Sequence, residues 1–139
     1  MGQTVSNGPM TLFDLAQRGM SAQLVRMNAA ASNLANASTV SSSEEGTYRP
    51  IRAVFAEELD KQTGLATVNV QSVVRENTRA IKEYNPDHPL ADADGNVWKT
   101  PVDENAEMVE MLESARQYQN LVEALSTAKQ LMLDTMRNK

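Results

Sequence analysis

A long apolar stripe near the C-terminus is the feature that most limits what this chain can fold into. From residue 108 to residue 136, side chains three and four positions apart are apolar or aromatic, with Lys129 the polar exception. That spacing places them on one face of a helix. Thr100 as N-cap, Pro101 at the first helical position and Asp103 in the capping-box position predict where this helix starts. We therefore expect a helix over 101–137, about 54 Å long at roughly 1.5 Å per residue.

A second stripe lies near the N-terminus. Thr11 and Asp14 have the spacing of a capping box, in which each side chain satisfies a backbone amide. Apolar residues then recur at helical spacing, so we expect a helix over 11–36, of which 12–35 would span about 36 Å. Asn33 and Asn36 are poor residues for a helix interior, but an amide can donate and accept at once. We interpret them as contacts that fix the register between neighbouring helices.

The difference in length between the two predicted helices bears on assembly. The shorter helix can cover only part of the longer one, so apolar surface remains without a partner inside the chain. The 8 methionines suit contacts with non-identical neighbours, because their side chains adapt in shape. We expect a mainly α fold in which the helices at 11–36 and 101–137 pair as a coiled coil and form one discontinuous helical core domain.

The segment between the helices, residues 37–100, has a different pattern, and residues 1–10 are expected to form a flexible leader. Alternating apolar residues and turn residues predict a small antiparallel β element of two to four short strands that leans on the helices. The expected elements, in order, are a loop at 38–46, an edge strand or extended arm at 48–57, a strand with one wet face at 68–74, its possible partner at 80–84, turns at 85–89 and 92–96, and a last strand at 97–99.

Composition excludes several classes of function. The net charge of −5 disfavours nucleic acid binding, which needs Lys and Arg to replace phosphate counterions. The chain has no cysteine and a single histidine, His88 in a predicted turn, so we expect neither a metal site nor a cofactor. No apolar run approaches the roughly 20 residues that cross a bilayer, and the N-terminus lacks the pattern of a Sec signal peptide. We therefore expect no nucleic acid partner and no direct membrane insertion.

No catalytic constellation emerges from the sequence. Asp92 and Asp94 resemble a fragment of a calcium loop, but the first and last ligand positions of such a loop lack carboxylates here, which favours a turn. The pairs Asp92/Asp94 and Glu44/Glu45 leave an acid–base enzyme as an alternative. We predict that the chain is not an enzyme.

Several motifs resemble a known family. Residues 31–37, Ala-Ser-Asn-Leu-Ala-Asn-Ala, resemble the N-terminal signature of the axial proteins of the bacterial flagellum, which are the rod, hook and hook-associated proteins. The match runs in order from about residue 11 to residue 136. It departs from the family pattern after Tyr118 and Gln119, where Asn120 follows at once and Leu121 takes the usual Asn position. The stretches that resemble proximal rod proteins in particular are 20–23, 40–44, 48–49, 54–56, 85–92, 118–119 and 127–129.

The resemblance implies a structural subunit of the proximal rod of the flagellar basal body. Such a subunit would be exported from the cytoplasm by flagellar type III secretion, without a Sec signal, and would polymerise through its terminal helices into the periplasm-spanning drive shaft. The implied partners are the rod proteins FlgB and FlgF, the rod-base adapter FliE and copies of the chain itself. An alternative is a soluble helical adapter or a binding module that resembles an export chaperone.

The candidate assembly interface follows the two stripes and the asparagines of the first helix. Its members are Phe13, Met20, Met27, Asn33, Leu34, Asn36, Met108, Met111, Ala115, Tyr118, Val122, Leu125, Met132 and Met136.

Overall fold

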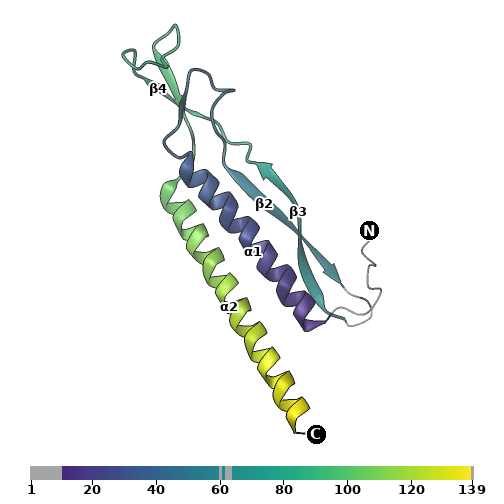
Figure 1. Ribbon diagram of the computed structural model, residues 1–139. Coiled ribbons are helices and arrows are strands. Elements are labelled where there is room, and N and C mark those ends of the chain that lie inside the picture. The colour runs from purple at the N-terminus through teal and green to yellow at the C-terminus, as the bar shows by residue number, and fades with distance from the viewer. Residues whose placement is uncertain (1–10, 60, 62–63, 139) are drawn as a thin grey trace, which may run out of the picture.

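The computed structural model describes residues 11–59, 61 and 64–138, so the expected leader at 1–10 lies outside the described residues. The fold has two long helices with short antiparallel strands between them, as the sequence predicts (Figure 1). The elements, in order, are α1 (Leu12–Ala35), β1 (Val40–Ser41), β2 (Ile51–Leu59), β3 (Ala66–Arg75), β4 (Ile81–Tyr84), β5 (Asn96–Lys99) and α2 (Glu104–Arg137).

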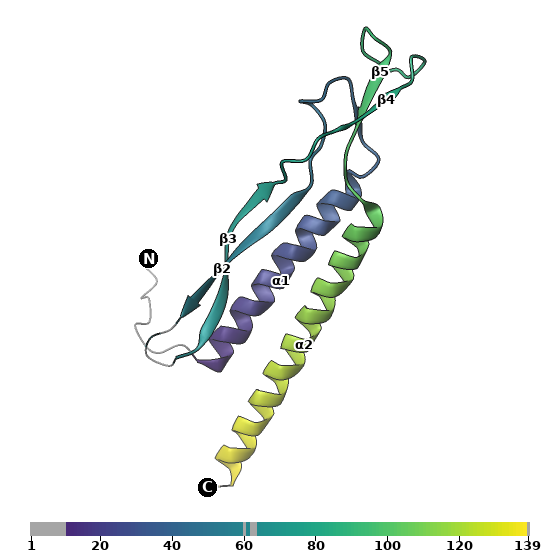
Figure 2. The same ribbon diagram turned by 180° about the vertical axis from the view of Figure 1, so that it is seen from behind.

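Helix α1 lies between α2 and the β2–β3 hairpin, and both views show the two helices side by side along their length (Figures 1 and 2). The predicted capping box starts α1, because the Asp14 amide donates to the Thr11 hydroxyl and the Thr11 amide donates to the Asp14 carboxylate, both at 3.1 Å. The helices run in opposite directions, since α1 begins near residues 125–128 of α2.

Small residues allow α1 to be covered on both sides. Its buried apolar residues are Ala16, Ala22, Ala29 and Ala30, and a Cβ added at Gly19 would lie 3.0 Å from Leu121 Cδ1. Close approach of two helices needs such short side chains at the contact. Within the part of the chain that the structure describes, no helix is long and apolar enough to cross a membrane.

The start of α2 differs from the prediction. Asp103 is the N-cap, and its carboxylate accepts from the amides of Asn105 at 3.0 Å and Ala106 at 3.3 Å. Thr100, the predicted N-cap, is buried, and its amide donates to the Thr39 carbonyl at 3.4 Å. Thr100 lies in the connection from β5 to α2, which pairs with the chain that leaves α1, and the Asp103 carboxylate caps the first turn three residues later.

The strands form two separate sheets rather than one β element. β2 and β3 pair along their whole length, whereas β5 lies between β1 and β4 in a three-stranded sheet. Two expectations are therefore wrong: the strand at 80–84 pairs with β5 and not with the strand at 68–74, and the loop at 38–46 contains β1. Short connections join β2 to β3 and β4 to β5, which limits the entropy lost on closing these loops, whereas β1 and β5 pair from distant parts of the chain.

Only one of the two sheets leans on the helices. Both strands of the β2–β3 hairpin contact α1, whereas β1, β4 and β5 contact neither helix among the described residues. The three-stranded sheet extends beyond the end of the helix pair (Figures 1 and 2). The expectation that the whole β element leans on the helices is therefore right for the hairpin and wrong for the second sheet.

Candidate functional site

Asn33 docks the hairpin onto α1 through a fully buried side chain. Its Nδ2 donates to the Ile51 carbonyl at 3.0 Å, and its Oδ1 accepts from the Ile51 amide at 2.9 Å and from the Tyr48 hydroxyl at 2.7 Å. The amide of Asn33 thus pairs with one residue of β2 in both directions, as a neighbouring strand would. The prediction that Asn33 contacts a neighbouring subunit does not fit this burial, because its hydrogen-bonding capacity is used within the chain.

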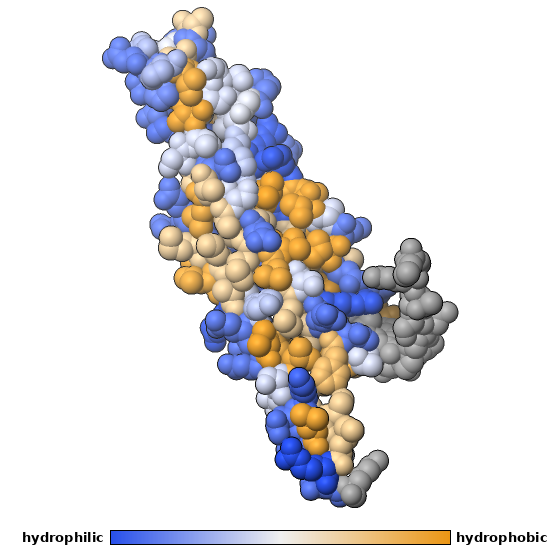
Figure 3. Space-filling view, in the orientation of Figure 1, coloured by the Kyte–Doolittle hydropathy of each residue, from blue (hydrophilic) through white to orange (hydrophobic). Residues whose placement is uncertain are grey.

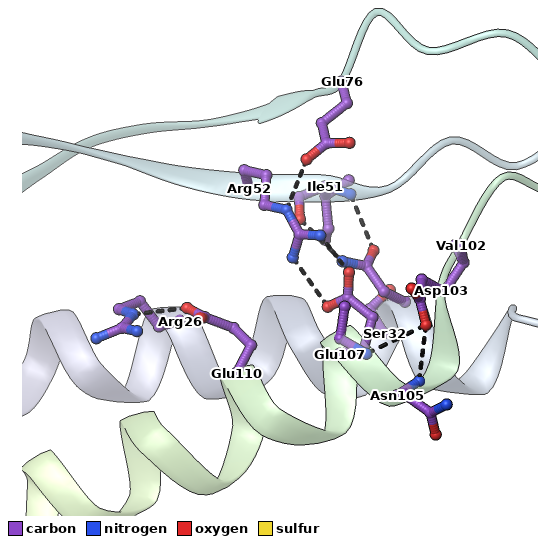
Figure 4. A network of polar contacts seen from close by, with 12 residues as sticks. Arg26, Ser32, Ile51, Arg52, Glu76, Val102, Asp103, Asn105, Glu107 and Glu110 are labelled. Carbon is purple, nitrogen blue, oxygen red and sulfur yellow. Dashed lines mark hydrogen bonds and ion pairs between the residues drawn. The ribbon is translucent and has the colours of Figure 1, made fainter.

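A charged cluster beside Asn33 connects the hairpin to α2 (Figure 4). The Arg52 guanidinium donates to both carboxylate oxygens of Glu107, with Nη1 at 2.9 Å from Oε2, and its Nε donates to Glu76 at 2.7 Å. Glu107 is only 1% exposed, so Arg52 is paired with a carboxylate that water barely reaches. The hydrogen bond with Glu107 is also the main reason that the pKa of Arg52 rises above its ordinary value. We call Asn33, Tyr48, Ile51, Arg52, Glu76 and Glu107 the polar junction.

A second ion pair crosses from α1 to α2 close to the polar junction. Arg26 Nε donates to Glu110 Oε1 at 2.8 Å, and Arg26 Nη1 donates to Gln23 at 2.9 Å. The hydrogen bond from Arg26 holds the pKa of the Glu110 carboxyl below its ordinary value. Arg26 and Glu110 are both half-buried, so their ion pair adds little to the stability of the fold. Its main effect is to fix the relative position of the two helices.

The face that α2 turns toward α1 is not centred on the predicted stripe. Its fully buried positions are Glu107 and Ser114, and Leu121 lies against Gly19. Periodicity of apolar residues could not identify the two polar positions. The Ser114 hydroxyl is satisfied by the carbonyls of Glu110 at 2.7 Å and Met111 at 3.0 Å, so its burial leaves no unpaired group.

The predicted interface residues on α2 consequently lie at the margins of the helix pair or outside it. Half-buried positions are Met111, Ala115, Tyr118 and Leu125, whereas Met108, Val122, Met132 and Met136 are exposed. The apolar residues Val109 and Leu112, which the predicted stripe does not include, are exposed beside Met108. The signal that could have found them is spacing, since Leu112 lies four residues after Met108 and three after Val109, and both spacings share a helix face.

The last part of α2 has no helix beside it. Leu12, Leu15 and Ala16 of α1 line a small apolar hollow with Leu121, Ala124, Leu125 and Ala128 of α2, and α1 begins there. Residues 129–137, which we call the overhang, continue beyond that point (Figures 1 and 2). Leu131, Met132, Leu133 and Met136 are all exposed in the overhang, with Met136 at 68%. Apolar and charged atoms alternate on its surface in Figure 3.

The predicted interface residues on α1 are less accessible than those on α2. Phe13, Met20, Met27, Leu34 and Asn36 are all half-buried in the single chain. Asn36 Nδ2 donates to the Ser32 carbonyl at 2.9 Å, so part of its amide serves to end the helix.

The carboxylates of the alternative enzyme site have structural partners. Asp92 Oδ1 accepts from the amides of Asn96 at 2.8 Å and Asp94 at 2.9 Å, and the first of these bonds is the main reason that the pKa of Asp92 falls below its ordinary value. Gly95 has a φ of +79°, which completes the turn that the sequence predicts. Glu44 lies 3.7 Å from Arg79. Among the described residues, no three acidic or histidine side chains gather as metal ligands would.

Comparisons with known proteins agree along most of the chain. Residues 13–40 match a family described as flagella basal body rod protein, and residues 93–138 match the C-terminal family of the flagellar basal body rod FlgEFG proteins. The flagellar basal-body rod protein FlgC of Salmonella typhimurium is 40% identical over 91% of this chain and 95% of its own length. FlgC of Yersinia enterocolitica is 38% identical over the same shares, and FlgC of Agrobacterium fabrum is 29% identical over 88% of each chain.

Proposed function

Because this chain belongs to the family of flagellar basal-body rod proteins, we propose that it polymerises through its terminal helices as a subunit of the proximal rod. As a rod protein it is a structural subunit of the basal body and not an enzyme. The finer steps are part of the proposal: export by flagellar type III secretion, folding at the growing end, and lateral packing into the shaft that crosses the periplasm.

The observation that carries this proposal is the apolar surface that α2 leaves uncovered. Within the described chain α2 contacts α1 and, at its N-terminal end, Arg52 of β2, and α1 does not extend along the overhang. A contiguous exposed apolar surface of this kind marks a contact with another protein. We propose that neighbouring subunits cover the overhang and the cluster of Met108, Val109 and Leu112.

The helix pair has a spacing that supports a coiled coil. Ser114 is buried, Leu121 contacts Gly19 and Ala128 shares an apolar hollow with Leu12, and these α2 positions recur every seven residues. A sustained seven-residue repeat winds helices around each other with a left-handed twist. We propose that α1 and α2 pair in this way and that neighbouring subunits add helices to the same bundle.

The proposed partners are the rod proteins FlgB and FlgF, the rod-base adapter FliE and further copies of this chain. Half-buried residues of α1, namely Phe13, Met20, Met27, Leu34 and Asn36, and the margins of α2 at Met111, Ala115, Tyr118, Val122 and Leu125 would form the lateral contacts. Asn33 would act indirectly, because it holds the hairpin in place on α1.

A truncation tests the proposal. A chain that stops after Lys129 loses most of the overhang but keeps the α2 residues that line the hollow with the start of α1. In cells that lack their own copy, we expect this variant to abolish swimming in soft agar and to disappear from detergent-resistant basal bodies. The substitutions Gln130→Ala and Thr135→Ala, at exposed polar positions of the same segment, are the matched controls and should leave both properties intact.

Two results would contradict the proposal. One is a motile strain that carries the truncated chain, since rod assembly would then not need the overhang. The other is a full-length chain that fractionates with soluble cytoplasmic proteins and never with basal bodies, which is the behaviour of an adapter or a chaperone-like module.

A further inference from the structure

The β2–β3 hairpin turns one face toward α1 and leaves the other face open. Glu58 accepts a hydrogen bond from Arg18 of α1, and Thr67, its partner across the sheet, is buried, so this pair lies on the inner face. Side chains alternate along a strand, which places Phe55 and Glu57 on the outer face. Their cross-strand partners, Val70 and Val68, belong to the same face.

A bulge enlarges this outer face. Val54 pairs with Ser72 and Phe55 pairs with Val70, so Gln71 is the extra residue on β3. The bulge reverses the alternation that the sequence suggests, and Val73, opposite Ala53, joins Val70 and Val68 on the outer face. Val68 and Val73 are 39% and 49% exposed. Apolar side chains gather over the hairpin in Figure 3. We call Ala53, Phe55, Val68, Val70 and Val73 the hairpin outer face.

The overhang carries a matching apolar row. Met132, Leu133 and Met136 follow Lys129 at intervals of three, four and seven residues, which places the four side chains on one helix face. A helix that docks into an apolar surface presents its anchors at this spacing.

Charges at the two surfaces are complementary. Glu57 lies on the hairpin outer face opposite Val68 and makes no ion pair within the described chain. Lys129 and Arg137 flank the apolar row of the overhang and are likewise without an ion pair among the described residues. Opposite charges on two surfaces favour their association and fix its register.

The two surfaces cannot meet within one molecule. α1 lies between α2 and the hairpin, and in the described chain α2 meets the hairpin through the Arg52–Glu107 ion pair, at the end of α2 opposite to the overhang (Figures 1 and 2). We propose that the hairpin outer face receives the overhang of a second copy of this chain, with Met132, Leu133 and Met136 on the valines and Phe55, and with Lys129 beside Glu57. This inference rests on the proposed function, and it names which surfaces of two copies meet.

Such a contact joins two different surfaces, so a bound pair still offers one unused hairpin outer face and one unused overhang. A contact of this type builds rings or open helical assemblies rather than closed symmetric pairs. It therefore fits a subunit that adds to the end of a shaft.

Cysteine cross-linking tests the contact, because the chain has no cysteine of its own. Val73→Cys and Met136→Cys chains would be expressed together in cells that lack their own copy, and isolated basal bodies would be oxidised and run on a non-reducing gel. We expect a cross-linked dimer from the mixture and none from either variant alone. Ser72→Cys, on the inner face of the hairpin, and Gln130→Cys, on another face of α2, are the matched controls and should give no dimer.

A charge exchange adds a second readout. Glu57→Lys should reduce the dimer yield in the Val73→Cys chain, and Lys129→Glu in the Met136→Cys chain should restore it. Basal bodies that contain both cysteine variants but give no cross-link would overturn this contact while the proposed function stands. A dimer from Met136→Cys alone would overturn it as well, since the overhangs would then pair with each other. If neither the variants nor the unmodified chain reach basal bodies, the proposed function itself is wrong.

Discussion

The two ends of α2 are stabilised in opposite ways. At its N-terminal end, a buried carboxylate is held by Arg52, and the neighbouring Asn33 amide pairs with Ile51. At its C-terminal end, four large apolar side chains are exposed, and no described helix or strand covers them. The first end is complete within the chain, whereas we propose that a neighbouring subunit completes the second. The stability of the single chain and its capacity to assemble are therefore encoded at separate places on one helix.

Loss of the Asn33 amide should have the largest effect on the stability of the single chain. Asn33→Leu keeps the branched shape of the side chain but leaves the amide and carbonyl of Ile51 without their partners on α1. At roughly 1–3 kcal/mol for each unpaired group, we expect the free energy of unfolding to fall by about 3–4 kcal/mol. Urea unfolding of the purified chain would measure this, with the exposed Asn28→Leu as control. Equal stability of the two variants would refute the docking role of Asn33.

Removal of the Glu107 carboxylate should have the next largest effect. Glu107→Ala leaves Arg52 with Glu76 alone, and because Arg52 is itself partly exposed, we expect a loss of about 2–3 kcal/mol, below the roughly 3–5 kcal/mol of a fully buried pair. The exposed Glu104→Ala, one turn earlier, is the matched control. A double substitution with Arg52→Leu should recover part of the loss, since neither charge is then left alone. No recovery would mean that Glu107 acts through packing only.

The Arg26–Glu110 pair predicts a small dependence of stability on pH. The pKa of Glu110 is lower in the folded chain than its ordinary value of 4.5, so its contribution is present above pH 4.5 and is lost as the pH falls through the folded pKa. Since the pair is partly exposed, we expect it to contribute about 0.5 kcal/mol. Glu110→Gln should flatten the acid limb of a stability curve measured by urea unfolding between pH 3 and pH 6. If Glu110→Gln leaves this pH dependence of stability unchanged, Arg26 and Glu110 do not form the ion pair in solution.

Substitutions in the overhang should barely alter the single chain. Met132→Ser combined with Met136→Ser replaces side chains that are exposed, so the free energy of unfolding should change by less than about 0.5 kcal/mol. The same variant should fail to join basal bodies, which co-purification would measure. A large loss of stability would mean that the overhang also stabilises the single chain, so the two ends of α2 would not differ in this respect.

Local signals predicted the helices well, and distant contacts explain what the sequence could not predict. Thr11 and Asp14 are three residues apart, and their capping box is present in the structure. Thr100 looked like an N-cap, but Thr39 binds its amide from another part of the chain. The strand at 80–84 pairs with β5 because a turn between these two strands brings them together.

The candidate site also has some features that the sequence predicts and others that it does not. The exposure of Met132 and Met136 follows from the unequal lengths of the two stripes, which the sequence alone indicates. The burial of Glu107 does not, because its partner Arg52 is 55 positions away and no periodicity connects them. The bulge at Gln71, which moves Val73 rather than Val74 to the face of Val70, has no local sign in an alternating strand.

The pairing of α1 with α2 joins the two ends of the chain, and this has a kinetic consequence. Arg26 and Glu110 are 84 positions apart, so their contact closes a loop that contains most of the protein. Contacts between such distant segments form slowly, because closing a long loop costs entropy before the contacts can compensate it. During synthesis, α2 is made after every other described element, so α1 has no helix to pair with until α2 has emerged. The order of the helices thus delays completion of the fold, which agrees with the proposed export before folding.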